Sequence, residues 1–249
     1  MPEPRRSLKA DRPTPEGGWL IYRHPVVVRV THWINVAAVV VLLMSGLNIL
    51  AAHPHLYWGV RSTFADPWLS FGEIPAGVMI PQGRDLAAGR LWHFACAWLF
   101  VLNGLIYLLY LAFTGRLARR IWPTRDDLAG FWRSVGDHAR LRFDHGETAR
   151  RYNVLQKISY AAMILVVLPM MLVTGLSMSP GFNAIGGVLL ELMGGRQSAR
   201  TLHFLSAGLI VAFIVVHVGL VIWTGVFNNM RAMTTGWFAI RPSNGDERR

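Results

Sequence analysis

Four apolar segments, each long enough to cross a lipid bilayer, constrain this chain more than any other feature of its sequence. They cover about Val26–Ala52, Leu91–Phe113, Val154–Met178 and Leu202–Phe227. A spanning helix needs about 20 mostly apolar residues, because the hydrocarbon core of a bilayer is about 30 Å thick. Only 16% of the residues are charged, against roughly 25% in soluble domains. The sequence therefore predicts an all-α integral membrane protein, with a four-transmembrane-helix bundle over residues 26–227.

The basic residues indicate how the helices are oriented. Of the 25 Lys and Arg residues, 20 fall on the side of the membrane that would hold both termini, and five fall on the other side. Positive charge marks cytoplasmic segments. We therefore expect a basic cytoplasmic tail over residues 1–25 and a second cytoplasmic tail over residues 228–249. The net charge of +11 then reflects contact with membrane lipid and topology, and no nucleic-acid partner is expected. No apolar region precedes the first helix, so no removable signal peptide is expected.

Two loops and one proline carry further signals. Residues 53–89, expected on the outer side, contain several aromatic side chains among Pro and Gly. These aromatics form either an interfacial belt or a platform for a partner protein. Residues 124–135 have the pattern of a helix that lies in the inner interface, with an ordinary solvated loop as the alternative. Pro169 is expected to kink the third helix.

Four histidines lie inside the apolar segments, namely His32, His93, His203 and His217. An ionisable side chain at membrane depth is costly and is a functional hypothesis by default. His203 and His217 are 14 residues apart, which is about 21 Å along one face of a helix. Because successive helices run in opposite directions, His93 and His203 are expected at one depth toward the outer side. His32 and His217 are expected at one depth toward the cytoplasm.

Two neutral imidazoles at one depth fit the axial positions of a b-type haem, because the porphyrin supplies the other four nitrogens. A zinc site would need more ligands at each level. Cys96 is the only cysteine, which excludes iron–sulfur clusters and covalent haem attachment. We therefore predict a di-haem bundle with two haem b groups and four iron ligands: His32, His93, His203 and His217. The alternatives are that the four histidines have only a structural role, that they transport protons or metal ions, or that a methionine replaces one axial ligand.

Three arginines add to this pattern. Arg29, Arg90 and Arg200 each precede one of the histidines by three residues. This spacing places each guanidinium on the same helix face as its histidine, one turn nearer the membrane surface. Because Arg is the natural partner of a carboxylate, we expect these side chains to bind haem propionates. The alternative is that they only mark helix ends and extend toward the interface.

Short motifs accompany the histidines. They are His24-Pro25, Arg29-x-x-His32-Trp33, Ser45-Gly46, Trp92-His93, Tyr152-Asn153-x-Leu155-Gln156-Lys157, Thr174-Gly175, and His203 with His217. Through these residues, from roughly Tyr22 to Gly225, the chain resembles the prokaryotic cytochrome b561 and nickel–iron hydrogenase b-type cytochrome family. It is also similar to the gamma subunit of formate dehydrogenase and to thiosulfate-reductase cytochrome b subunits.

The resemblance implies a cytochrome of the bacterial cytoplasmic (inner) membrane that moves electrons between a quinone and a periplasmic redox subunit. That partner would be a molybdenum enzyme or a hydrogenase-like protein. The quinone would bind near the inner haem, where Arg29, Trp33 and Asn35 are candidates by proximity. An electron-transfer subunit of an oxidoreductase complex is expected rather than an enzyme by itself, so no catalytic residue is assigned. The alternatives are a free-standing quinone-linked oxidoreductase, such as a superoxide oxidase, and a haem-free membrane anchor.

Overall fold

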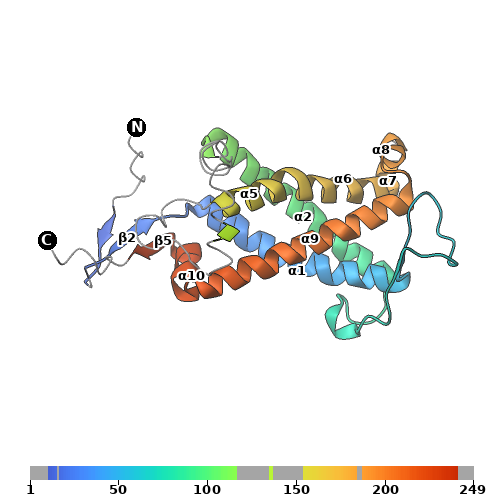
Figure 1. Ribbon diagram of the computed structural model, residues 1–249, viewed down its shortest axis with the longest axis horizontal. Coiled ribbons are helices and arrows are strands. Elements are labelled where there is room, and N and C mark those ends of the chain that lie inside the picture. Colours follow the sequence, from blue (N-terminus) through green and yellow to red (C-terminus); the bar gives the residue numbers. More distant parts are fainter. Residues whose placement is uncertain (1–10, 16, 117–134, 137–153, 184–186, 241–249) are drawn as a thin grey trace. The chain divides into compact units, whose positions relative to one another are not determined.

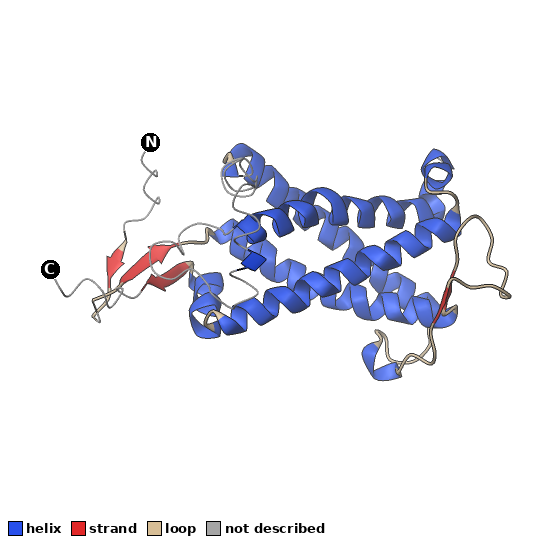
Figure 2. Cartoon of the chain, viewed as in Figure 1, coloured by secondary structure: helices blue, strands red, loops and turns tan. Residues whose placement is uncertain are grey.

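The computed structural model describes residues 11–15, 17–116, 135–136, 154–183 and 187–240. Helices dominate these residues (Figures 1 and 2). They are α1 (Val26–Ala52), α2 (Leu86–Phe113), α5 (Val154–Ala162), a π-helical segment (Met163–Val167), α6 (Leu168–Met178), α7 (Pro180–Asn183), α8 (Gly187–Leu192), α9 (Arg196–Trp223), α10 (Val226–Thr235) and a 3-10 turn (Ala76–Val78). The strands are β1 (Arg12–Pro13), β2 (Trp19–Tyr22), β3 (His55–Leu56), β4 (Leu69–Ser70) and β5 (Trp237–Ile240). The interfacial helix expected at 124–135 falls almost entirely outside the described residues.

Four helical segments are long and apolar enough to cross a membrane, which confirms the predicted fold class. They are α1, α2, the continuous stretch Val154–Met178, and α9. Three boundaries differ from the sequence prediction: α2 begins earlier, at Leu86, and α9 both begins earlier, at Arg196, and ends earlier, at Trp223. The last spanning helix, α9, ends at Trp223 because Gly225, at φ 106°, interrupts the helical conformation before α10 begins.

Burial along these helices has the pattern of a membrane protein. Large apolar side chains such as Leu91, Val215 and Ile222 are exposed, as expected for surfaces that meet lipid. The fully buried positions instead include small polar residues, among them Ser45, Thr174 and Ser177. Helices in a membrane associate through small residues and interhelical hydrogen bonds, because apolar contact with lipid is no worse than apolar contact with protein.

The third spanning segment contains an irregular turn where the sequence predicted a kink. Residues Met163–Val167 are π-helical, and Pro169 lies in the first turn of α6 directly after them. Proline has no N–H to donate to the carbonyl of Leu165, four residues earlier, and its ring would collide with that carbonyl in a regular helix. A single π-helical turn relieves this conflict.

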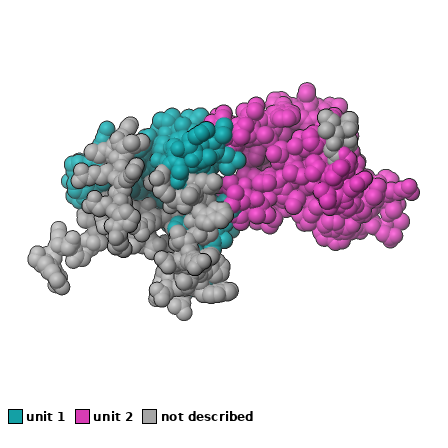
Figure 3. All heavy atoms as spheres, turned by 90° about the horizontal axis from the view of Figure 1, so that it is seen from above, with its two compact units in different colours: residues 1–32, 107–161, 215–249 teal, residues 33–106, 162–214 magenta. Residues whose placement is uncertain are grey.

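The described chain divides into two compact units, coloured in Figure 3. Unit 1 comprises residues 1–32, 107–161 and 215–249, and unit 2 comprises residues 33–106 and 162–214. Each of the four spanning segments contributes to both units, so that each unit has its own set of packed helix segments.

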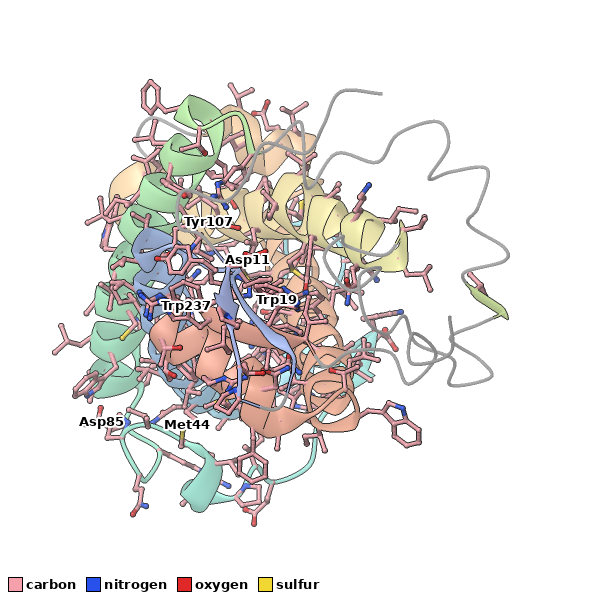
Figure 4. All side chains as sticks on the ribbon, turned by 90° about the vertical axis from the view of Figure 1, so that its left-hand side faces the viewer. Asp11, Trp19, Met44, Asp85, Tyr107 and Trp237 are labelled. Carbon is pink, nitrogen blue, oxygen red and sulfur yellow. The ribbon has the colours of Figure 1, made fainter. Side chains whose placement is uncertain are left out.

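Unit 1 contains a three-stranded antiparallel sheet in the order β1-β2-β5. Trp19 pairs with Ile240 and Tyr22 with Trp237; Figure 4 labels Trp19 and Trp237 on these strands. The rings of Tyr22 and Trp237 meet edge to face at 5.3 Å, and the guanidinium of Arg12 lies 4.4 Å from the Trp237 ring centre. The sheet joins two segments that the sequence analysis described only as tails.

Unit 2 contains the long loop between α1 and α2, residues 53–85, and the first turns of α9 hold this loop in place. The hydroxyl of Thr201 donates a hydrogen bond to the carbonyl of Tyr57 at 2.6 Å. The backbone N–H of Gly59 donates to the hydroxyl of Ser198 at 2.7 Å. Two loop residues, Leu56 and Met79, are fully buried. The loop is therefore a packed part of unit 2.

Two polar side chains fix the other end of the long loop. Asn48 of α1 donates hydrogen bonds from its amide nitrogen to the carbonyls of Pro81 and Gly83, at 2.9 and 3.0 Å. Asp85, labelled in Figure 4, accepts a hydrogen bond from the backbone N–H of Ala88 at 3.0 Å. A carboxylate at this position caps the start of a helix, so Asp85 marks where the loop ends and α2 begins.

Candidate functional site

Unit 1 brings together His32 of α1 and His217 of α9. Their ring centres lie 6.4 Å apart, and the two ring planes are inclined by 54°. Both residues come from helices that span the membrane, and they are the two histidines that were expected at the cytoplasmic depth. We call them the unit 1 pair.

Unit 2 brings together His93 of α2 and His203 of α9, here called the unit 2 pair. Their ring centres lie 6.2 Å apart, with ring planes inclined by 63°. Each ring has a hydroxyl beside its Nδ1 atom. The Oγ of Ser45 lies 3.1 Å from Nδ1 of His93, and the Oγ1 of Thr174 lies 3.0 Å from Nδ1 of His203. These two hydroxyl groups come from the remaining helices of the bundle, α1 and α6.

The spacing within each pair suits one metal ion between two imidazoles. Metal–imidazole bonds are roughly 2 Å long, so a shared ion sets the two ring centres roughly 6 Å apart. Among the described residues, no group of three or more His, Cys, Asp and Glu side chains could hold a metal ion. Each pair therefore offers two nitrogen ligands and no further protein ligand from that part of the chain. Haem iron needs only these two, because four ligands come with the porphyrin.

Two glycines allow the rings of the unit 2 pair to approach neighbouring helices. A Cβ atom at Gly46 would lie 3.5 Å from Cε1 of His93, and one at Gly175 would lie 3.3 Å from Cε1 of His203. A side chain larger than methyl at either position would displace the ring. Gly104 on α2, by contrast, has no neighbour within 4 Å of its Cβ position.

The three arginines have different surroundings. Arg29 donates from its guanidinium to the backbone carbonyl of Thr234 in the last turn of α10, and its Nε atom is buried without a hydrogen-bond partner among the described residues. A cation at the carboxyl end of a helix is favoured by the helix dipole. Arg90 is exposed, with its guanidinium 5.7 Å from the ring centre of Phe94.

Arg200 is partly buried in unit 2, where its guanidinium donates to the backbone carbonyls of His53 and His55 in the long loop. Three polar atoms in the same part of unit 2 are buried without a partner in the described chain: Nε2 of His53, Oη of Tyr57 and Oε1 of Gln197. Burial, together with the charges of Arg200 and His55, lowers the pKa of His53 from 6.5. The His53 ring is therefore neutral at pH 7.

A carboxylate would fit these surroundings of Arg200. Buried polar groups are nearly always hydrogen-bonded, and an unpaired one points to a missing ligand, water or ion. The phenol of Tyr57 can donate, and so can one nitrogen of a neutral histidine. With the positive charge of Arg200, the cluster has the composition of a site for a carboxylate such as a haem propionate, one helical turn from His203.

One candidate for the quinone site has a structural partner. Asn35 of α1 accepts a hydrogen bond of 2.6 Å from the side-chain amide of Asn103 on α2. Interhelical hydrogen bonds of this kind hold membrane helices together. Trp33, the second candidate, is partly exposed on α1.

Sequence reasoning assigned no role to several residues that the structure places at these sites. Ser45 and Thr174 appeared only within short motifs, Tyr57 was counted only among the aromatic residues of the long loop, and Asn48 and Thr201 were not singled out. Their common signal is a polar side chain, in or next to an apolar segment, that the structure buries. Such a signal marks many structural positions too, so it does not identify a site on its own.

Spanning helices that hold paired histidines at their interfaces are the arrangement of membrane b-type cytochromes. Comparison with known proteins gives the family: the profile described as "Prokaryotic cytochrome b561" matches residues 23–236, and the chain belongs to this family. Membership implies b-type haem as the cofactor. The chain is thus a cytochrome b561-type membrane cytochrome.

Curated relatives extend over most of the chain. A putative protein-methionine-sulfoxide reductase subunit, YedZ1, from Azospira oryzae is 34% identical over 198 residues, covering 80% of this chain and 89% of the relative. A probable Ni/Fe-hydrogenase B-type cytochrome subunit from Rhodobacter capsulatus is 24% identical, covering 86% and 79%. A protein of the same description from Azotobacter vinelandii is 23% identical, covering 91% of each chain. No solved structure matches the chain.

Proposed function

We propose that this protein carries electrons between the quinone pool and a periplasmic redox partner through two bis-histidine b haems. The observation that carries the proposal is the pairing itself. Within each unit, two histidine rings from different helices lie close enough that both could hold one haem iron. The unit 1 pair would hold one haem and the unit 2 pair the other. Bound haem supplies one-electron redox chemistry.

The protein's own residues bind and orient these groups. The four histidines would supply the iron ligands, while Gly46 and Gly175 leave room beside the rings of the unit 2 pair. Arg200, with Tyr57 and His53, would receive a propionate of the unit 2 haem. Arg90, at the start of α2, is exposed and would reach a propionate from the membrane surface. Arg29, through its buried Nε, would do so for the unit 1 haem.

The distribution of basic residues supports an orientation with both termini in the cytoplasm. The unit 1 pair then lies toward the cytoplasm and the unit 2 pair toward the periplasm, in the bacterial inner membrane. A quinone would bind beside the unit 1 pair, where Arg29 and Trp33 remain candidates. Asn35 is a weaker candidate, because its amide oxygen already accepts a hydrogen bond from Asn103.

A redox enzyme as partner is supported by the relatives, which are described as subunits of a methionine-sulfoxide reductase and of Ni/Fe hydrogenases. The partner would be a molybdenum enzyme or a hydrogenase-like protein, docked on the long loop. That loop exposes Trp58, Phe64 and Trp68, while the first turns of α9 hold its backbone in place. Exposed aromatic groups on a fixed backbone are typical of protein interfaces.

Electron transfer across a sealed membrane tests this proposal directly. The purified protein is reconstituted into liposomes that contain a reduced quinone, and an impermeant one-electron acceptor is placed on the periplasmic side. We expect the quinol to reduce both haems and the acceptor to be reduced in turn. His32→Ala should stop quinol-dependent reduction of the remaining haem, whereas His93→Ala should leave the unit 1 haem reducible and block transfer to the acceptor. Haems that quinol does not reduce would contradict the quinone link.

A further inference from the structure

The hydroxyl groups of Ser45 and Thr174 each donate their proton to a backbone carbonyl of their own helix. The Oγ of Ser45 donates to the carbonyl of Val41 at 2.6 Å, and the Oγ1 of Thr174 donates to the carbonyl of Met170 at 2.7 Å. A hydroxyl has a single proton and two lone pairs. Toward the histidine beside it, each oxygen can therefore act only as an acceptor.

An acceptor beside Nδ1 determines which nitrogen of the ring carries the proton. A hydrogen bond forms at His93 and at His203 only if Nδ1 is protonated. Nε2 is left with a free lone pair, which is the form that binds iron.

The same two-residue arrangement occurs on two different helices. In Ser45-Gly46 on α1 and in Thr174-Gly175 on α6, a hydroxyl residue is followed by a glycine. In each case the hydroxyl contacts Nδ1, and the glycine leaves room for Cε1 of the same ring. The distance from that Cε1 to the position of a Cβ is 3.5 Å at Gly46 and 3.3 Å at Gly175. Ser45 and Thr174 are both fully buried. Both ligands of the unit 2 pair are thus held by one kind of contact.

We propose that Ser45 and Thr174 are positioning residues that fix His93 and His203 as Nδ1-protonated ligands and lower the reduction potential of the haem between them. An acceptor on Nδ1–H makes the opposite nitrogen more electron-donating and orients the ring. Greater donation favours ferric over ferrous iron. The inference rests on the proposed function in that it takes the unit 2 pair as haem ligands.

Potentiometric titration of the purified protein, followed by the visible spectrum, tests the inference. In Ser45→Ala and in Thr174→Ala we expect the potential of one haem to rise while that of the other is unchanged, and haem affinity to fall about tenfold to a hundredfold. Ser45→Thr and Thr174→Ser keep the hydroxyl and should restore the wild-type potential. Ser177→Ala removes a buried hydroxyl of α6 that donates to the Thr174 carbonyl, and it should leave both potentials unchanged.

Each other outcome has a clear meaning. If both alanine variants retain two haems at wild-type potentials, the hydroxyls only fill space and the inference is overturned. Loss of one haem in the alanine variants but not in the hydroxyl-keeping variants supports it, whereas loss in both kinds of variant shows a packing effect and overturns it. A wild-type protein without haem overturns the proposed function, and this inference with it, and the wild-type spectrum alone shows that result.

Discussion

At the scale of single residues, the proposed carboxylate site around Arg200 leads to a prediction for Tyr57→Phe. Whether this substitution stabilises or destabilises the site depends on whether a ligand is bound. Tyr57→Phe removes a buried hydroxyl that has no partner in the described chain. Without a ligand, loss of an unsatisfied polar group is neutral or stabilising. With a propionate bound, it removes a hydrogen bond to a charged group, worth about 1.5–3 kcal/mol. We therefore expect Tyr57→Phe to release haem more readily than the wild type.

Haem transfer to an excess of an apo-globin acceptor measures this release, and Tyr22→Phe is the control. Tyr22 lies in the sheet of unit 1, with its ring against Trp237, so its hydroxyl should not affect haem release. Equal release from Tyr57→Phe and the wild type would show that the Tyr57 hydroxyl does not contact the cofactor.

The glycine beside His203 gives a second prediction at this scale. A Cβ at Gly175 already lies 3.3 Å from the His203 ring, so the branched side chain in Gly175→Val must push the ring aside. Gly208 lies on α9 with nothing within 4 Å of its Cβ position. We expect Gly175→Val to purify with about one haem fewer per chain than the wild type, and Gly208→Val to keep the wild-type content. A full haem content in Gly175→Val would contradict the contact.

Much of the site was predictable from the sequence, and the limit has a physical reason. The rise of a helix fixes depth, so spacing alone predicted that His32 would meet His217 and that His93 would meet His203. Which residue of a third helix touches each ring depends on how that helix is rotated about its axis. Nearly uniform apolar segments do not determine this rotation, so the contacts of Ser45 and Thr174 could not be predicted.

At the scale of elements, the sheet of unit 1 depends on Gly236, which ends α10 in the left-handed conformation, at φ 90°. A Cβ there would lie 2.5 Å from Cε2 of Tyr22 and 2.8 Å from the carbonyl oxygen of His24. Gly225 also has a positive φ, 106°, but nothing lies within 4 Å of its Cβ position. An alanine in this conformation costs about 1–2 kcal/mol, and only Gly236→Ala adds a backbone collision to that cost.

We therefore expect Gly236→Ala to loosen the pairing of β2 with β5 and Gly225→Ala to leave that pairing intact. Limited proteolysis in detergent checks this by the rate of cleavage near Trp237. Equal cleavage rates in the two variants would mean that the collision at Gly236 is relieved without loss of the sheet.

The spanning helices were predictable because hydrophobic length is a property of the chain itself. The start of α9 at Arg196 was less predictable, because the helix begins with the mostly polar stretch Arg196–Thr201. In this stretch Ser198 and Thr201 bind the long loop rather than lipid. The sheet was missed for a similar reason. Its strands are two to four residues long, and β2 and β5 lie near opposite ends of the sequence, so no local periodicity indicates that they pair.

At the scale of the whole molecule, the orientation follows from charge alone and needs its own test. A fluorescent protein fused after Arg249 should fluoresce, because it would fold in the cytoplasm. Alkaline phosphatase inserted at the exposed Asp66 of the long loop should be active, because it would reach the periplasm. The reverse result would invert the assignment of the two haems to the two sides of the membrane.

The central claim is that two histidine pairs hold two b haems. We would first purify the protein in detergent and count haem per chain from reduced-minus-oxidised and pyridine haemochrome spectra. The account predicts two b haems, with one lost in His32→Ala or His217→Ala and the other lost in His93→Ala or His203→Ala. A protein without haem, or with a single haem that is indifferent to His203→Ala, would contradict it.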